Sequence, residues 1–226
     1  MESEMLCRLK HALRSDNIHL KYQPIYSILT KEIVGFEALL RWRDPHFGRV
    51  CPETVVALAV KNGLMHSVSA CVIKRAISEM VEIIKAHALF LSLNLNPADL
   101  ISDSFKNLLV TELADKQISP SSIILEITEV PCNDLMALNK GAVALAEKGF
   151  RLALDDFGKG CSDVARLRSL PISEVKIDRA MTHRLFATDN TDAQVMCDSL
   201  YQAPYALIFE GVETQTQLAW LAKRFP

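Results

Sequence analysis

From about residue 50 onward, short β-rich runs alternate with amphipathic helical segments, and this alternation constrains the fold more than any other feature. Repeated strand–helix units predict a parallel sheet covered by helices. Strands are expected at 88–95, 123–128, 150–155, 175–177 and 205–209. Helices are expected at 52–61, 66–85, 103–116, 133–148, 162–168, 192–201 and 214–224. The chain is therefore predicted to form an α/β fold of the (β/α) barrel type.

The first 50 residues follow another pattern. A short amphipathic helix is expected at 4–14, followed by β-rich runs at 19–28 and 32–42 with only a tight turn between them. Such a short connection joins antiparallel strands, since a parallel crossover needs about a dozen residues or more. The total is then seven strands, where a closed barrel has eight. We expect one domain over 1–226, with an N-terminal helix in 1–16 and an incomplete barrel in 17–226.

The composition of the chain argues against several classes of function. A net charge of −2, without a basic run, argues against direct binding of nucleic acid. The sequence has no apolar run long enough to span a membrane, and its acidic first residues do not resemble a signal peptide. The six cysteines form no C-x-x-C pair, which favours reduced thiols in a cytosol. A cytoplasmic protein without membrane contact is expected.

Two adjacent carboxylates form the most informative stretch of the sequence. Asp155 and Asp156 follow the apolar run 152–154 and precede Gly158 and Gly160, as at the end of a buried strand. Two ionised carboxylates there repel each other unless a cation lies between them. A solvated Asp-Asp turn explains this stretch equally well when it is taken alone.

Other strands carry polar residues at similar places. In a (β/α) barrel the strand ends meet at one mouth, where active sites lie. The polar residues concerned are Glu37, Asn94, Glu126, Asp155, Asp156, Lys176 and Glu210. Carboxylate and amide oxygens suit Mg²⁺ or Mn²⁺, and adjacent aspartates could each face one ion of a two-metal site. With Lys176 as a cation near the reacting water, this set predicts phosphodiester hydrolysis. Aldol-type or enolase-type chemistry, or a polar rim that binds no ligand, are the alternatives.

Several ordered motifs carry a family resemblance. They are Tyr22-Gln23-Pro24-Ile25, Glu37-Ala38-Leu39 followed by Leu40-Arg41-Trp42, Leu93-Asn94-Leu95, Glu126-Ile127-Thr128-Glu129, Asp155-Asp156-Phe157-Gly158, Lys176-Ile177-Asp178 and Glu210-Gly211-Val212-Glu213. From about residue 20 to 221, the chain resembles the EAL domain family of bacterial phosphodiesterases, which linearise cyclic di-GMP to pGpG. The resemblance implies a modified barrel with one antiparallel strand.

The resemblance also implies residue roles. Glu37, Asn94, Glu126 and Asp155 match the ligands of one metal, and Asp156 matches a ligand of a second metal that shares Asp155. Lys176 matches a contact to the attacking water, and Glu210 a carboxylate that completes the site. Arg41 matches a contact to the substrate phosphate, while Gln23 and Asp178 match substrate-side positions. Glu129 matches the residue that anchors the loop after Asp156, a loop linked in the family to dimerisation.

The sequence departs from the family in several places. Lys159 replaces a small or hydroxyl residue, Cys161 and Val60 are unusual, and the stretch 182–205 is about two residues short. The family's eighth strand, with its Gln-Gly-Tyr motif, and its final helix are not found. Open strand edges favour contact with a second copy or another protein.

Three functions therefore stay open. These are a cyclic di-GMP phosphodiesterase, a catalytically silent EAL-like regulator, and a non-catalytic cyclic di-GMP receptor. A regulator would act by protein contact, for example with the flagellar master transcription regulator, and would control motility, biofilm or virulence. The complete set of acidic residues favours the enzyme.

Overall fold

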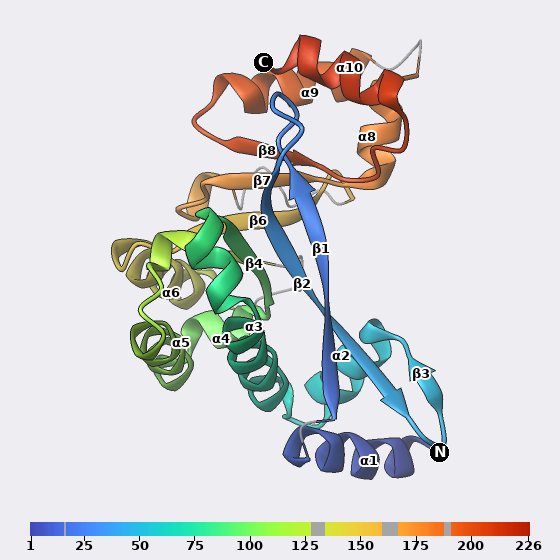
Figure 1. Ribbon diagram of the computed structural model, residues 1–226, viewed down its shortest axis with the longest axis vertical. Helices are drawn as coiled ribbons and strands as arrows, with labels where there is room; N and C mark the ends of the chain where they lie inside the picture. The colour runs from blue at the N-terminus through green and yellow to red at the C-terminus, as the bar shows by residue number, and fades with distance from the viewer. Residues whose placement is uncertain (16, 128–133, 160–166, 188–190) are drawn as a thin grey trace.

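The computed structural model describes residues 1–15, 17–127, 134–159, 167–187 and 191–226 (Figure 1). Its elements up to the middle of the chain are α1 (Glu2–Arg14), β1 (Ile18–Tyr26), β2 (Ile33–Asp44), β3 (Gly48–Val50), α2 (Pro52–Lys61), α3 (Met65–His87), β4 (Phe90–Leu95), α4 (Pro97–Ile101) and α5 (Asp103–Asp115). The later elements are the 3₁₀ helix η1 (Pro120–Ser122), β5 (Ile123–Ile127), α6 (Leu135–Glu147), β6 (Arg151–Phe157), β7 (Glu174–Ile177), α8 (Arg179–Leu185), α9 (Thr191–Gln202), β8 (Ala206–Phe209) and α10 (Gln215–Arg224).

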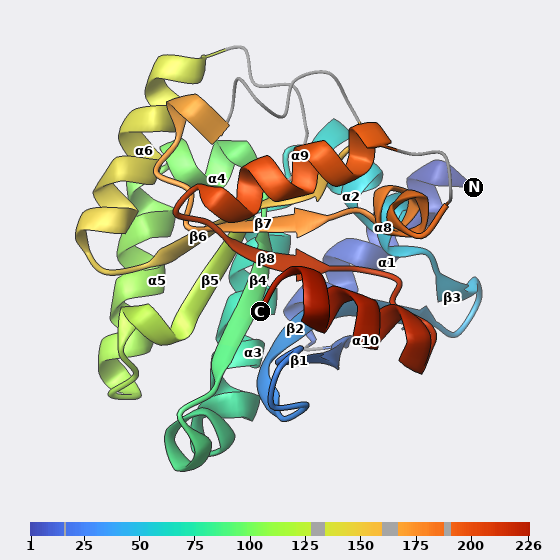
Figure 2. The same ribbon diagram turned by 90° about the horizontal axis from the view of Figure 1, so that it is seen from above.

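One curled sheet organises the molecule. Its strand order is β1-β2-β4-β5-β6-β7-β8, and all neighbours from β2 to β8 along this path run parallel. The long hairpin of β1 and β2 is antiparallel, as the short turn between them predicted. The predicted α/β fold with one antiparallel strand at its start is confirmed, and the sheet forms a half-barrel (Figure 2).

The outer face of the sheet holds the main core. Every second residue of the central strands is apolar and buried, as in Leu93, Leu125, Leu152 and Val175. These side chains pack with buried residues of α3, α5 and α6, which lie together on one side of the sheet in Figure 1. Burial of apolar surface contributes about 25 cal/mol per Å² removed from water, so this layer is the main source of stability.

The inner face carries the polar residues. The register pairs Asn94 with Glu126, and it pairs Ala153 of β6 with both Glu126 and Glu174. Asp155 lies two residues after Ala153, and Lys176 two residues after Glu174. Glu210 lies two residues after Ile208, which pairs with Lys176. Because side chains two residues apart lie on the same face of a strand, all of these groups face the inside of the half-barrel. The alternation explains why polar residues interrupt otherwise apolar strands.

Some elements were not predicted from the sequence. The short strand β3 pairs with the last three residues of β2, and it brings the sheet to eight strands although the main path has seven. The helices α4 and α8 were also missed, and the predicted helix at 162–168 lies mostly outside the described residues. Within the described part of the sheet β8 pairs only with β7, so β1 and β8 are its two edges.

None of the described helices combines the length and apolar character needed to cross a lipid bilayer. At the far end of the hairpin, α1 covers a second small core. Its residues Leu9 and Ala12 pack there with Ile18, Trp42 and Val55.

Substitution of Gly141 tests how closely α6 packs on α4. A Cβ atom at this position would lie 2.1 Å from the carbonyl oxygen of Leu100. Replacement of a helical glycine by alanine normally stabilises a helix by up to about 1 kcal/mol. We expect Gly141→Ala instead to lower the free energy of unfolding by about 1–3 kcal/mol, because the backbone of α4 must move. Urea denaturation measures this change, with Val143→Ala on the exposed side of α6 as control. A more stable Gly141→Ala variant would contradict the packing.

Candidate metal centre and adjoining pocket

The Lys176 side chain lies at the centre of an acidic cluster at the mouth of the half-barrel. Its Nζ atom is 2.9 Å from Asp155 Oδ1, 3.0 Å from Glu126 Oε2, 3.0 Å from Glu210 Oε1 and 3.3 Å from Glu37 Oε2. The carboxylates come from β2, β5, β6 and the end of β8. Strands that are distant in the sequence thus meet at one ammonium group.

Neutral side chains orient two of the carboxylates. Asn94 Nδ2 donates a hydrogen bond of 2.9 Å to Glu37 Oε1, and Ser92 Oγ donates one of 2.6 Å to Glu126 Oε1. Both donors come from β4, which lies between β2 and β5. Sequence reasoning missed Ser92, although its position two residues before Asn94 places it on the same face of the strand.

Burial controls the ionisation of the cluster. Glu126 and Lys176 are almost fully buried. Burial raises the pKa of Glu126 well above its ordinary value. The positive charge of Lys176 lowers this pKa, whereas the negative charges of Glu37 and Asp155 raise it further. Burial also raises the pKa of Glu210. Burial alone would lower the pKa of Lys176, but the surrounding carboxylates hold it above its ordinary value, so the ammonium keeps its proton.

A local irregularity lets Asp155 and Asp156 both serve the site. Adjacent side chains of a regular strand point to opposite faces. The pairing of β6 with β7 shifts register between Leu154 and Phe157, and Asp156 has a positive φ of 56°. This left-handed conformation is uncommon outside glycine but accessible to aspartate. The two carboxylates therefore reach two neighbouring positions of one site.

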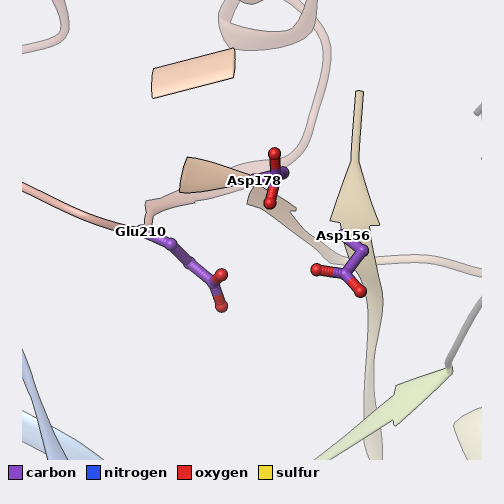
Figure 3. Close-up of side chains that lie close together, drawn as sticks. All are labelled: Asp156, Asp178 and Glu210. Atoms are coloured by element: carbon purple, nitrogen blue, oxygen red, sulfur yellow. The ribbon is translucent and has the colours of Figure 1, made fainter. Parts of the chain in front are cut away.

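Asp156 belongs to a second acidic group with Asp178 and Glu210. Carboxylate oxygens of these three residues lie within 4.8 Å of one another, and Figure 3 shows that they come from the ends of adjacent strands. Lys159 Nζ lies 2.5 Å from Asp156 Oδ1 and 3.2 Å from Asp178 Oδ2. The hydrogen bond to Asp156 is the main cause that raises the pKa of Lys159.

Asp178 also begins α8, because its Oδ1 accepts a hydrogen bond of 2.8 Å from the Ala180 amide. Burial alone would raise the pKa of Asp178, but this amide and Lys159 hold it below its ordinary value.

The residues present fit a divalent metal ion. Four carboxylates face one ammonium in the inner cluster, so three negative charges are unbalanced when all of them are ionised. The buried Asp155 Oδ1 accepts no hydrogen bond from any described residue, although it lies at ion-pair distance from Lys176. This oxygen is paired in charge with Lys176 but has no well-directed hydrogen bond, so it remains available to a metal ion. Oxygen donors without sulfur or imidazole suit Mg²⁺ or Mn²⁺.

A pocket of about 730 Å³ opens beside the acidic cluster. Glu37 and Asn94 belong to both the cluster and the pocket wall, and Arg41 lines the pocket from the same strand as Glu37. Most of the remaining wall is apolar, with residues of α2 and α3 such as Val56, Ala57, Met65, Val68 and Val72. The pocket thus offers apolar walls for flat rings and one guanidinium for an anionic group.

Most of the predicted site residues come together in the structure. Glu37, Asn94, Glu126, Asp155, Lys176 and Glu210 form the inner cluster and its hydrogen bonds. Gln23 is paired with Glu37 across the hairpin, which places it on the same face. Asp178, expected on the substrate side, lies with Asp156 and Glu210. Glu129 and Cys161 lie outside the described residues.

A curled parallel sheet with an acidic, oxygen-rich cluster at its strand ends is typical of barrel-type proteins that have their sites at this edge. Comparison of the sequence with known families makes the assignment specific. Residues 6–224 match the EAL domain, so the chain belongs to the EAL domain family.

Known proteins support this assignment. The cyclic di-GMP phosphodiesterase PA2567 of Pseudomonas aeruginosa is 33% identical over 215 residues, which cover 93% of this chain but 37% of that protein. The solved structure described as PaMucR phosphodiesterase in complex with c-di-GMP is 29% identical, with a TM-score of 0.81, over 96% of this chain and 92% of the other. The EAL enzyme Bd1971 shares the fold, with a TM-score of 0.86 at 23% identity, over 99% of this chain and 64% of the other. This chain spans well under half the length of the curated relatives it matches.

The raised pKa of Glu126 predicts a pH-dependent stability for the metal-free protein. Because the folded state binds this proton more tightly than the unfolded state, stability falls as pH rises above the ordinary glutamate pKa. Each such proton contributes at most about 1.4 kcal/mol per pH unit. We expect Glu126→Gln to flatten this decline between about pH 5 and about pH 8. Chemical denaturation at several pH values in the presence of EDTA measures the free energy of unfolding. An equal change of this free energy with pH in wild type and Glu126→Gln would contradict the raised pKa of Glu126.

Proposed function

We propose that this chain hydrolyses cyclic di-GMP to linear pGpG with two divalent ions, Mg²⁺ or Mn²⁺. The observation that carries the proposal is the set of four carboxylates around Lys176, with a buried oxygen of Asp155 that takes no hydrogen bond from the described residues. The family assignment and the phosphodiesterases among its relatives support the same substrate class. We also propose that the whole of 1–226 acts as one EAL unit.

Protein side chains would hold the ions. In the proposed arrangement Glu37, Asn94, Glu126 and Asp155 bind one ion. Asp156 binds the second, together with Asp155, and the carboxylates of Asp178 and Glu210 lie close enough to Asp156 to share this ion. Divalent ions in such sites activate water and stabilise charge on the oxygens around phosphorus. Since Asn94 donates to Glu37 in the structure, its carbonyl oxygen stays available as a donor to metal.

Lys176 and Glu210 would act on the water and the phosphate. The Lys176 ammonium is fixed by its carboxylates and almost fully buried, so it is ready to orient a water or a phosphate oxygen. In hydrolysis the water oxygen bonds to phosphorus, one phosphodiester P–O bond breaks, and the leaving ribose oxygen gains a proton. Glu210, whose pKa is raised by burial, is proposed to exchange a proton in this step.

The adjoining pocket would bind part of the dinucleotide. Its apolar wall suits a guanine base, and Arg41 suits a phosphate, since guanidinium pairs well with phosphate oxygens. Because Glu37 and Asn94 line the pocket, a phosphate bound there would lie next to the proposed metal ligands. Gln23 is proposed on the substrate side of the hairpin, opposite Glu37.

Glu37→Gln tests hydrolysis. The substitution keeps the size of the side chain and an acceptor for Asn94, but removes a charge from the metal site. We expect the rate of pGpG formation with Mg²⁺ or Mn²⁺ to fall about a hundredfold or more. Chromatography of the nucleotide products measures the rate.

Glu112→Gln is the matched control for that experiment, because Glu112 lies in α5 at the surface, 3.7 Å from Lys74. It should leave the rate unchanged. If the folded wild-type chain binds cyclic di-GMP without cleaving it, the receptor function replaces the enzyme. If it neither binds nor cleaves it, the protein-contact regulator does.

Arg41→Ala tests the pocket. Loss of a charge-assisted hydrogen bond costs about 1.5–3 kcal/mol, so we expect the Kd for cyclic di-GMP to rise at least about tenfold. Calorimetry in the Glu37→Gln background measures binding without turnover. Arg43→Ala is the control, since Arg43 is on the same strand but does not line the pocket. Equal effects of the two substitutions would exclude a specific role for Arg41.

A further inference from the structure

Two lysines sit in the acidic site in different ways. The Lys176 side chain is 3% exposed and its ammonium contacts four carboxylates. The Lys159 side chain is 51% exposed and contacts Asp156 and Asp178. Lys159 is therefore an ammonium at the rim that can swing out into solvent.

The local backbone directs Lys159 to this position. The Lys159 amide donates a hydrogen bond of 3.2 Å to the Asp156 carbonyl, which closes a tight turn after the left-handed Asp156. Gly158 in this turn has a φ of 106°, and a Cβ there would lie 2.5 Å from Met181 Sδ. The turn is thus fixed by packing, and it carries the lysine back over the carboxylate three residues earlier.

The Lys159 ammonium occupies space that a second metal ion would need. Asp156 and Asp178, its two partners, are two of the three residues whose carboxylate oxygens lie within 4.8 Å of one another. A divalent ion bound to these oxygens would meet the positive charge of Lys159 at close range. Since Asp178 already accepts a hydrogen bond from Ala180 through Oδ1, its Oδ2 is the oxygen for which the two cations compete.

We propose that Lys159 is a built-in, displaceable cation that competes with the second divalent ion for Asp156 and Asp178. This inference rests on the proposed function for its metal site. A divalent ion at Asp156 and Asp178 then enters only when Lys159 swings out. Lys159 is a positioning residue that sets metal stoichiometry, not a group that touches the substrate.

Mn²⁺ binding tests this directly, with the metal alone as the probe. Free Mn²⁺ is followed by electron paramagnetic resonance during titration of the full chain, for wild type, Lys159→Gln and Lys159→Arg. Breaking an exposed ion pair costs up to about 1 kcal/mol, and relief of the charge repulsion adds to it. We therefore expect Lys159→Gln to tighten the weaker Mn²⁺ site by about tenfold. Lys159→Arg should bind like wild type, because it keeps the charge.

Lys106→Gln is the matched control, because Lys106 pairs with Asp103 at the same sequence spacing, with Nζ 2.8 Å from Oδ1. It should leave both Mn²⁺ affinities unchanged. Thermal unfolding gives a second measurement: Mn²⁺ should raise the Tm of Lys159→Gln more than that of wild type.

Three results would overturn the inference: equal Mn²⁺ binding by wild type and Lys159→Gln, equal tightening in Lys159→Arg, or no Mn²⁺ binding by any variant. A chain that binds Mn²⁺ as expected but does not cleave cyclic di-GMP refutes the proposed hydrolysis alone, so the two failures are distinguishable.

Discussion

The ion pairs of Lys176 with four carboxylates are the interaction on which the rest of the structure depends. The acids come from strands spread over most of the chain, and the sheet must curl for them to meet at one ammonium. Removal of one partner from a buried ion pair typically costs about 3–5 kcal/mol, because the other charge stays buried. The same contacts that hold the mouth of the half-barrel together therefore also assemble its chemistry.

The two ends of the inner face differ in their charge balance. At the opposite end from the metal centre, Arg151 Nη2 lies 2.5 Å from Glu174 Oε1, and the Arg151 guanidinium stacks over Phe90 at 5.0 Å. This pair is fully matched in charge, so it stabilises without demanding a ligand. The cluster around Lys176 is not matched in charge. An excess of buried negative charge is costly, and it lies at the end where the proposed function places the metal ions.

Regular parts of this structure could be predicted from the sequence, whereas its irregular parts could not. Alternation of apolar and polar residues identified the strands, and their polar members, such as Asn94 and Glu126, gave the inner cluster. The place of Asp178 beside Asp156 depends on a register shift and on a left-handed residue. Both are set by packing between distant segments, which local propensity does not encode. Short elements such as β3 and α8 were missed for the same reason.

Glu37 and Asn94 are shared between the acidic cluster and the wall of the pocket. Under the proposed function one carboxylate contacts both the metal ion and the pocket ligand, so we expect occupancy of the cluster and occupancy of the pocket to be thermodynamically linked. By reciprocity, whatever factor an ion adds to the affinity of a pocket ligand, that ligand adds to the affinity of the ion. We then expect ion concentration to change how much ligand the pocket holds, before any bond is broken. In the proposed function, the hydrogen bond between these two side chains connects the metal ligands to the nucleotide pocket.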